Sequence, residues 1–118
     1  MRVLVLGASS NPQRYSNMVM RDLRYYNHEV VAVGRKSGEV EGMKIQTNLP
    51  EDSIIDTVTV YLSEQNQGLY MAYLKNLKPK RVIFNPGAEN DKLAMGLEEL
   101  GVECVEACTL VMLRTNQF

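Results

Sequence analysis

The chain has 118 residues, with 13 basic and 14 acidic side chains and a formal net charge of -1. This length suits one ordinary domain and is too short for a separate catalytic domain, so residues 1–118 are predicted to form a single domain. A nearly neutral chain has no overall field that attracts nucleic acid or an anionic membrane. The sequence also has no apolar stretch of about 18 residues and no secretory signal pattern, so we expect a cytoplasmic protein without nucleic-acid or membrane partners.

The first sixteen residues predict a buried strand, Val3 to Leu6, that breaks at a glycine and leads through a loop into a helix. A glycine lets the backbone approach a ligand closely, and the free N–H groups of a helix start attract anions. Hydroxyl groups and an arginine in the loop are suited to a pyrophosphate. The predicted phosphate-binding residues are Gly7, Ala8, Ser9, Ser10, Asn11, Pro12, Arg14, Tyr15 and Ser16.

Further apolar runs recur along the chain at Val30 to Val33, Thr57 to Leu62 and Arg81 to Phe84, with a weaker run at Val102 to Val105. Short runs rich in valine and isoleucine are typical of parallel strands that are buried on both faces. Helical spacing separates them, because apolar side chains recur every three or four residues. The helical positions are Val19, Leu23 and Tyr26, then Tyr70, Tyr73, Leu74 and Leu77, then Leu93, Leu97 and Leu100.

The helix boundaries are predicted from capping residues. Ser16, Ser63 and Asn90 are N-cap candidates, and Gly101 is suited to ending a helix. The segment from Ser37 to Ser53 contains glycines and a proline where a crossover helix would be expected, so it predicts a loop with a short extended piece. That extended piece is placed at Met43 to Gln46.

Strands alternating with helices predict an α/β fold, a doubly wound parallel sheet of five strands in the order 3-2-1-4-5. Ligands of such sheets bind beyond the carboxyl ends of the strands, at the point where the winding reverses. In this order the reversal falls between the first strand and Arg81 to Phe84. Three further segments should therefore converge on the first loop: Gly34, Arg35 and Lys36; Tyr61, Leu62 and Ser63; and Asn85, Pro86 and Gly87.

The first loop departs from the dinucleotide fingerprint G-x-G-x-x-G, since Ser9 and Pro12 occupy the second and third glycine positions. An NAD site also needs a carboxylate after the second strand, where this chain has Arg35 and Lys36. Cations at that point favour a ligand with an additional ribose phosphate. Coenzyme A carries this phosphate at the 3′ position and NADP carries it at the 2′ position, so both cofactors remain open.

The residue pattern resembles the stand-alone CoA-binding proteins, which are similar to the CoA-binding portion of the succinyl-CoA synthetase α subunit. The resemblance rests on the following segments: Gly7-Ala8-Ser9 with Pro12, Arg14 and Ser16; Val33 to Lys36 followed by Glu39, Val40 and Gly42; Asn85-Pro86-Gly87 with Asn90; and Cys108 with Val111 and Met112. It implies a Rossmann-like domain that holds CoA or acyl-CoA, with the pyrophosphate on the first loop and the adenosine end near Lys36. The chain departs from the family where Gly34-Arg35 replaces Asn-Pro and where Leu62 replaces an arginine.

The remaining chemistry-bearing residues do not form a catalytic or metal-binding set. Cys104 and Cys108 are predicted to be reduced thiols, and one histidine, His28, is expected at the edge opposite the ligand. The main hypothesis is a non-catalytic CoA-binding or regulatory module. The alternatives are an NADP-dependent reductase, for which Tyr61 is the candidate proton donor, and an interaction protein with a vestigial crevice. A homodimer or another protein partner stays open.

Overall fold

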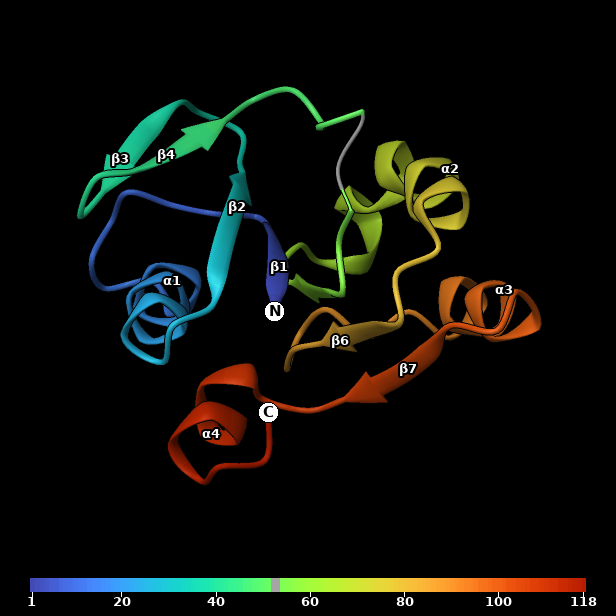
Figure 1. Cartoon of the computed structure of the whole chain (residues 1–118). Helices are drawn as coiled ribbons and strands as arrows, with labels where there is room; N and C mark the ends of the chain where they lie inside the picture. Colours follow the sequence, from blue (N-terminus) through green and yellow to red (C-terminus); the bar gives the residue numbers. More distant parts are fainter. Residues whose placement is uncertain (52–53) are drawn as a thin grey trace.

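The central sheet has the strand order β3-β4-β2-β1-β5-β6-β7 in the computed structural model, which describes residues 1–51 and 54–118 (Figure 1). Helices cover both faces of the sheet, as predicted for an α/β chain. The strands are β1 (Arg2–Leu6), β2 (Glu29–Val33), β3 (Gly38–Val40), β4 (Met43–Gln46), β5 (Thr57–Val60), β6 (Arg81–Phe84) and β7 (Glu103–Glu106). The helices are α1 (Tyr15–Tyr25), α2 (Gly68–Leu77), α3 (Asp91–Glu99) and α4 (Thr109–Arg114), with a short 3₁₀ helix, η1 (Glu64–Asn66).

The strand count and the strand order both differ from the prediction. The described residues form seven strands rather than five, and β5 lies beside β1 instead of beyond β2. The place beside β2 belongs to β4, which pairs with it in parallel. Because Met43–Gln46 was predicted as part of a loop, the next strand, Thr57–Val60, was predicted in the place beside β2 that β4 occupies. The winding therefore reverses between β1 and β5, not between β1 and β6.

The predicted loop after β2 contains an antiparallel hairpin, which makes the sheet mixed. Gly38 pairs with Ile45 and Val40 with Met43, and the turn residues Glu41 and Gly42 have φ of 48° and 83°. Two consecutive positive φ values are typical of the tight turns whose twist suits a hairpin. The expected extended piece at Met43–Gln46 is confirmed as β4. The last two residues of the predicted loop, 52–53, lie outside the described residues.

Two apolar layers enclose the sheet, because successive residues of a strand face opposite sides. Leu4 and Leu6 of β1 face the layer that contains Leu74 of α2 and Leu93 and Leu97 of α3. Val3 and Val5 face the layer made by α1 and α4, which includes Val19, Met20, Leu23, Leu110 and Leu113. Figure 1 shows this division, with α1 and α4 together and α2 and α3 on the other side.

The helix boundaries agree only in part with the predicted caps. Asn90 is confirmed as an N-cap, since its Oδ1 accepts the Leu93 N–H at 3.0 Å. Ser16 is not a cap but lies buried within α1, whose N-cap is Arg14 and which has no side-chain cap. Ser63 precedes η1 rather than α2. Tyr26 and Leu100 follow the last turns of their helices and stay partly exposed, whereas Gly101 ends α3 with a φ of 87°, as expected.

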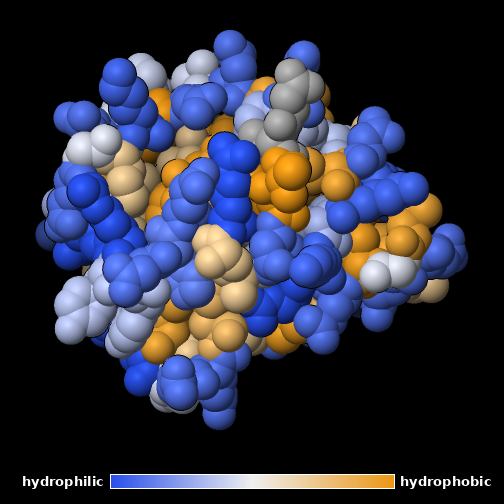
Figure 2. Space-filling view, viewed as in Figure 1, coloured by the Kyte–Doolittle hydropathy of each residue, from blue (hydrophilic) through white to orange (hydrophobic). Residues whose placement is uncertain are grey.

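The outer surface is mostly hydrophilic on the face shown in Figure 2, where apolar side chains emerge as separate patches. The sheet edges are also polar: β7 begins and ends with the exposed residues Glu103 and Glu106, and β3 carries exposed Glu39. No helix among the described residues is long and apolar enough to cross a membrane.

A cluster at the amino ends of the strands contains the chain's histidine. The Met1 ammonium group lies 3.2 Å from His28 Nδ1, and the His28 ring packs edge-on against Phe118. The guanidinium group of Arg81 lies over the same Phe118 ring, 4.6 Å from its centre. His28 is therefore at the end of the sheet away from the predicted ligand crevice, as expected.

The pKa of His28 is lowered by burial first, and then by the nearby Met1 ammonium and Arg81. Because protonation is disfavoured in the folded chain, the stabilisation from neutral His28 is complete above its unfolded pKa and is lost as the pH falls through the lowered value. We predict that a drop from about pH 7.5 to about pH 5 reduces thermal stability more in the wild type than in His28→Gln. Equal losses in the two proteins, measured by differential scanning calorimetry, would contradict this assignment.

Candidate functional site

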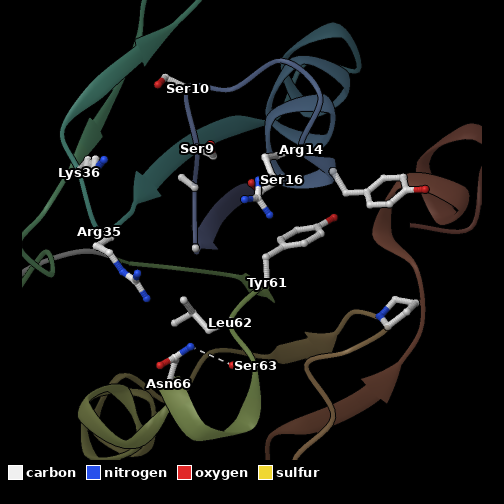
Figure 3. A pocket seen from close by; sticks show the side chains of 14 residues that line it. Ser9, Ser10, Arg14, Ser16, Arg35, Lys36, Tyr61, Leu62, Ser63 and Asn66 are labelled. Carbon is white, nitrogen blue, oxygen red and sulfur yellow. Dashed lines mark hydrogen bonds between the residues drawn. The ribbon is translucent and has the colours of Figure 1, made fainter.

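A cavity of about 630 Å³ opens at the carboxyl ends of the central strands (Figure 3). Its walls come from the loop after β1, the start of α1, and the segments that follow β2, β5 and β6. This size lies within the range of small-molecule sites, about 300–1,000 Å³. The lining residues are Gly7, Ala8, Ser9, Ser10, Arg14, Tyr15, Ser16, Arg35, Lys36, Tyr61, Leu62, Ser63, Asn66 and Pro86.

The loop after β1 is held in shape by its own polar groups. The Asn11 N–H donates to Ser9 Oγ at 3.1 Å, and the Gln13 N–H donates to Asn11 Oδ1 at 3.0 Å. Asn17, buried in α1, donates from Nδ2 to the Ser9 carbonyl at 2.9 Å. These bonds fix the loop before the start of α1, which has no side-chain cap and whose first residues, Tyr15 and Ser16, line the cavity.

Two glycines allow the loops to approach each other closely. Gly7 has a φ of 90°, and a Cβ there would lie 3.1 Å from the Tyr61 carbonyl carbon. At Gly34 a Cβ would lie only 2.3 Å from the Ala8 carbonyl oxygen. The N–H groups of Gly7 and Ala8 both donate to the Val33 carbonyl, at 2.9 and 3.0 Å. The segments that follow β1, β2 and β5 are therefore in close contact through their backbones where they leave the sheet.

The charge of the cavity is positive. Arg14, Arg35 and Lys36 line it, whereas no aspartate or glutamate does so among the residues that the structure describes. Arg14 comes from the start of α1, and the other two cations come from the end of β2 on the opposite wall (Figure 3). A chain with a net charge of -1 thus concentrates three cations at one site. Such an arrangement attracts a polyanion locally.

Five predicted site residues do not line the cavity. Gly34 packs beneath it against Ala8, and Asn11 and Pro12 lie on the outer part of the first loop, where Asn11 forms a turn and the Pro12 carbonyl accepts from Arg21. Gly87 makes a turn with a φ of 92°. Asn85 is buried and supports the site from below: Nδ2 donates to Thr59 Oγ1 and the Val60 carbonyl, and Oδ1 accepts the Thr109 N–H. Pro86 is the part of that turn that reaches the cavity.

Tyr61 forms part of the floor, at the end of β5. Its hydroxyl group is buried and has no hydrogen-bond partner among the described residues. Burial raises the pKa of the phenol well above its ordinary value. The group therefore stays protonated at physiological pH, which suits a hydrogen-bond donor and not a general base.

Two more residues line the cavity: Ser63, from a segment that was expected to converge there, and Asn66, which was not predicted. Ser63 and Asn66 lie around η1, and Asn66 Nδ2 donates to Ser63 Oγ at 2.9 Å. Ser63 comes after Tyr61 and Leu62 beyond the end of β5, where the rule that ligands bind beyond strand ends placed it. The sequence carries no signal that places Asn66 at the site, because its position there depends on the turn of η1, which brings it toward the cavity.

The two cysteines are free thiols outside the cavity lining. Cys104 packs against the layer of α2 and α3, and burial, with Glu98 and Glu103 nearby, raises its pKa to about 11. Cys108 packs against the layer of α1 and α4. Both side chains are partly buried and contribute to the packing around the sheet.

Comparisons with known proteins agree with this arrangement. Residues 1–114 match the family described as CoA binding domain. The uncharacterized protein YneT of Bacillus subtilis is 32% identical over 104 residues, which cover 85% of this chain and 75% of that protein. A crystal structure of an uncharacterized protein is 46% identical, with a TM-score of 0.95 over 99% of this chain and 97% of the other. The dinucleotide-forming acetyl-coenzyme A synthetase 1 of Ca. Korarchaeum cryptofilum shares the fold, at 15% identity and a TM-score of 0.73 over 90% of this chain and 25% of that one.

The mostly parallel sheet with helices on both faces and a cavity at its switch point defines a Rossmann-like domain. The family match covers residues 1–114, which is nearly the whole chain, so it assigns the domain to one family. The chain belongs to the CoA-binding domain family.

The contact between Gly34 and Ala8 yields a test of the site's architecture. We predict that Gly34→Ala lowers the free energy of unfolding by about 1–3 kcal/mol, because the new methyl group must displace a backbone carbonyl. Gly68→Ala is the matched control, since a Cβ at Gly68 meets nothing within 4 Å. Chemical denaturation measures both. Equal stability of Gly34→Ala and the control would show that the loops are not in close contact.

Proposed function

We propose that this protein binds coenzyme A or an acyl-CoA as a small non-catalytic module. The observation that carries the proposal is the cavity in which the start of α1 and three cations meet without a carboxylate among the described lining residues. Coenzyme A has a pyrophosphate and a ribose 3′-phosphate, so it offers anionic groups to both walls. The membership of the chain in a CoA-binding family supports this ligand class.

In this proposal the pyrophosphate binds to the loop from Gly7 to Ser16. Arg14 and the free N–H groups at the start of α1 hold it through charge-assisted hydrogen bonds. Lys36, with Arg35 beside it, holds the 3′-phosphate at the end of β2. The pantetheine arm then passes over Tyr61 and Pro86 toward β6, where the cavity wall carries fewer charges.

The proposed role is binding without turnover. The one histidine of the chain, His28, lies at the other end of the sheet, so it cannot act on a ligand in the cavity. Tyr61 keeps its proton because burial raises the pKa of its phenol. Neither group is available as a base at the ligand.

The test compares CoA with dephospho-CoA by isothermal titration calorimetry. We predict that CoA binds about tenfold or more tightly, since a hydrogen bond between charged groups contributes about 1.5–3 kcal/mol. Lys36→Gln should remove most of that difference. Lys44→Gln is the matched control, because Lys44 is an exposed cation of β4 outside the cavity lining.

With NADPH titrated alongside, three outcomes would contradict the proposal in different ways. Equal affinities for CoA and dephospho-CoA in the wild type would refute the role of the cations after β2. Tighter binding of NADPH than of CoA would favour the reductase alternative, because the same cations could hold a 2′-phosphate. Binding of neither cofactor would favour an interaction protein with a vestigial crevice.

A further inference from the structure

The loop between β1 and α1 is braced from behind by two side chains of α1 that lie outside the cavity lining. Asn17 is 2% exposed, and its Nδ2 donates to the Ser9 carbonyl at 2.9 Å. Arg21, one helical turn further on, donates from Nε to Asn17 Oδ1 at 2.9 Å and from Nη2 to the Pro12 carbonyl at 3.3 Å. Two carbonyl groups of the loop are therefore held by side chains of one helix.

Arg21 decides which way the Asn17 amide faces. A guanidinium group only donates hydrogen bonds, so the Asn17 atom that meets Arg21 Nε must be the oxygen. The nitrogen then faces the Ser9 carbonyl and donates to it. With the amide reversed, two donors would meet at Arg21 and two acceptors would meet at Ser9. Because Asn17 is buried, water would not satisfy these groups, and the reversed orientation is costly.

The direction of the Ser9 carbonyl sets the direction of the next amide group. In a planar trans peptide unit the carbonyl and the N–H point in opposite directions, and the described residues contain no cis peptide bond. Since the Ser9 carbonyl faces Asn17, the N–H of Ser10 points away from Asn17. Ser9 and Ser10 both line the cavity (Figure 3), and the Ser10 N–H has no backbone acceptor among the described residues. This donor is available to a ligand.

We propose that Arg21 is a positioning residue for the ligand pyrophosphate and acts through Asn17, an inference that rests on the proposed function. Arg21 does not touch the ligand. It holds the Asn17 amide, and that amide keeps the Ser9 carbonyl turned away from the anion. The N–H of Ser10 then donates to a pyrophosphate oxygen. If this peptide unit flipped, a carbonyl oxygen would face the anion instead, so the brace decides between attraction and repulsion.

The shape of the arginine side chain suits this role. Its two acceptors are a side-chain oxygen of α1 and a main-chain carbonyl of the loop, and the planar guanidinium group fixes the distance between them. A loop held in this way before the ligand arrives loses less entropy on binding. Arg21 also brings a positive charge behind the loop, so its test must separate position from charge.

The experiment titrates CoA into the wild type, Arg21→Gln and Arg21→Lys by isothermal titration calorimetry. We expect both variants to bind about fivefold to tenfold more weakly, the loss that corresponds to one hydrogen bond of ordinary strength. Lysine keeps the charge but lacks the planar fork, so it should not restore the affinity. The matched control is Arg114→Gln, which should bind as the wild type does. Arg114 Nε also donates to a side chain of α1, Asp22 Oδ2, at 2.9 Å, but from α4 and outside the cavity lining.

The backbone amide resonance of Ser10 gives a readout that a purely structural role would not move. In the wild type, CoA should shift the Ser10 amide proton downfield, because a proton donated to an anion is deshielded. At saturating CoA this shift should be smaller in Arg21→Gln and unchanged in Arg114→Gln. Two-dimensional NMR spectra of the labelled proteins measure the shift and also show that each variant is folded.

Asn17→Asp tests the intermediate step. Aspartate keeps an acceptor for Arg21 but has no N–H to donate to the Ser9 carbonyl. We expect it to lose the Ser10 shift and to bind CoA more weakly than either Arg21 variant. Because Asn17 is buried, this variant could fail to fold, in which case the two Arg21 variants carry the test alone.

The outcomes distinguish failure of the positioning role from failure of the proposed function. If CoA binds the wild type and Arg21→Gln equally well, the positioning role is wrong and the proposed function stands. Full affinity in Arg21→Lys would show that only the charge matters, which also overturns the positioning role. The same holds if CoA leaves the Ser10 amide of the wild type unshifted. If CoA does not bind the wild type at all, the proposed function and the positioning role are both overturned.

Discussion

The site depends on the contact between the backbones that leave β1 and β2. The Val33 carbonyl accepts hydrogen bonds from both Gly7 and Ala8, and the Cα of Gly34 packs against the Ala8 carbonyl where no side chain could fit. Because the backbone groups at the ends of β1 and β2 are paired with each other, the two segments that follow these strands must diverge immediately beyond the sheet. The loop from Gly7 to Ser16 then turns to one side of the cavity, and Arg35 and Lys36 turn to the other. The positive walls face each other as a result.

Buried amides provide the corresponding support on the β5 and β6 side. Asn85 links β6 to β5 and to the start of α4, while Gln67 links the segment after β5 to the turn after β6. Each amide uses both its oxygen and its nitrogen, so burial leaves these groups satisfied. Loops that carry binding residues are often mobile, but here their bases are tied to the core. The lining side chains therefore stand on a fixed frame.

The sequence predicted the features that repeat along the chain and missed those that depend on tertiary contacts. Apolar runs such as Val3–Leu6 identified the parallel strands because burial on both faces leaves no polar positions. The hairpin was missed because β3 has only 3 residues and β4 has 4, which is too short for a clear alternation. That omission also made the strand order wrong.

For the candidate site, the rule that ligands bind at strand ends correctly predicted that four segments converge there. The sequence could not show which side chains of these segments reach the cavity. Asn85 has the position of a ligand-binding residue but turns inward to bond with Thr59. Asn66 lies beyond the strand end, and the single turn of η1 brings it to the cavity mouth. Both outcomes are decided by contacts between segments that are distant in sequence.

The polar sheet edges have a consequence for how the protein behaves at high concentration. A free strand edge presents unpaired backbone groups, on which a second molecule can add its own strand and begin an aggregate. At one end of this sheet, β7 displays Glu103 and Glu106, so two copies meeting there would bring like charges together. At the other end β3 is too short to serve as a template. Both edges of this sheet thus disfavour the addition of a strand from a second molecule.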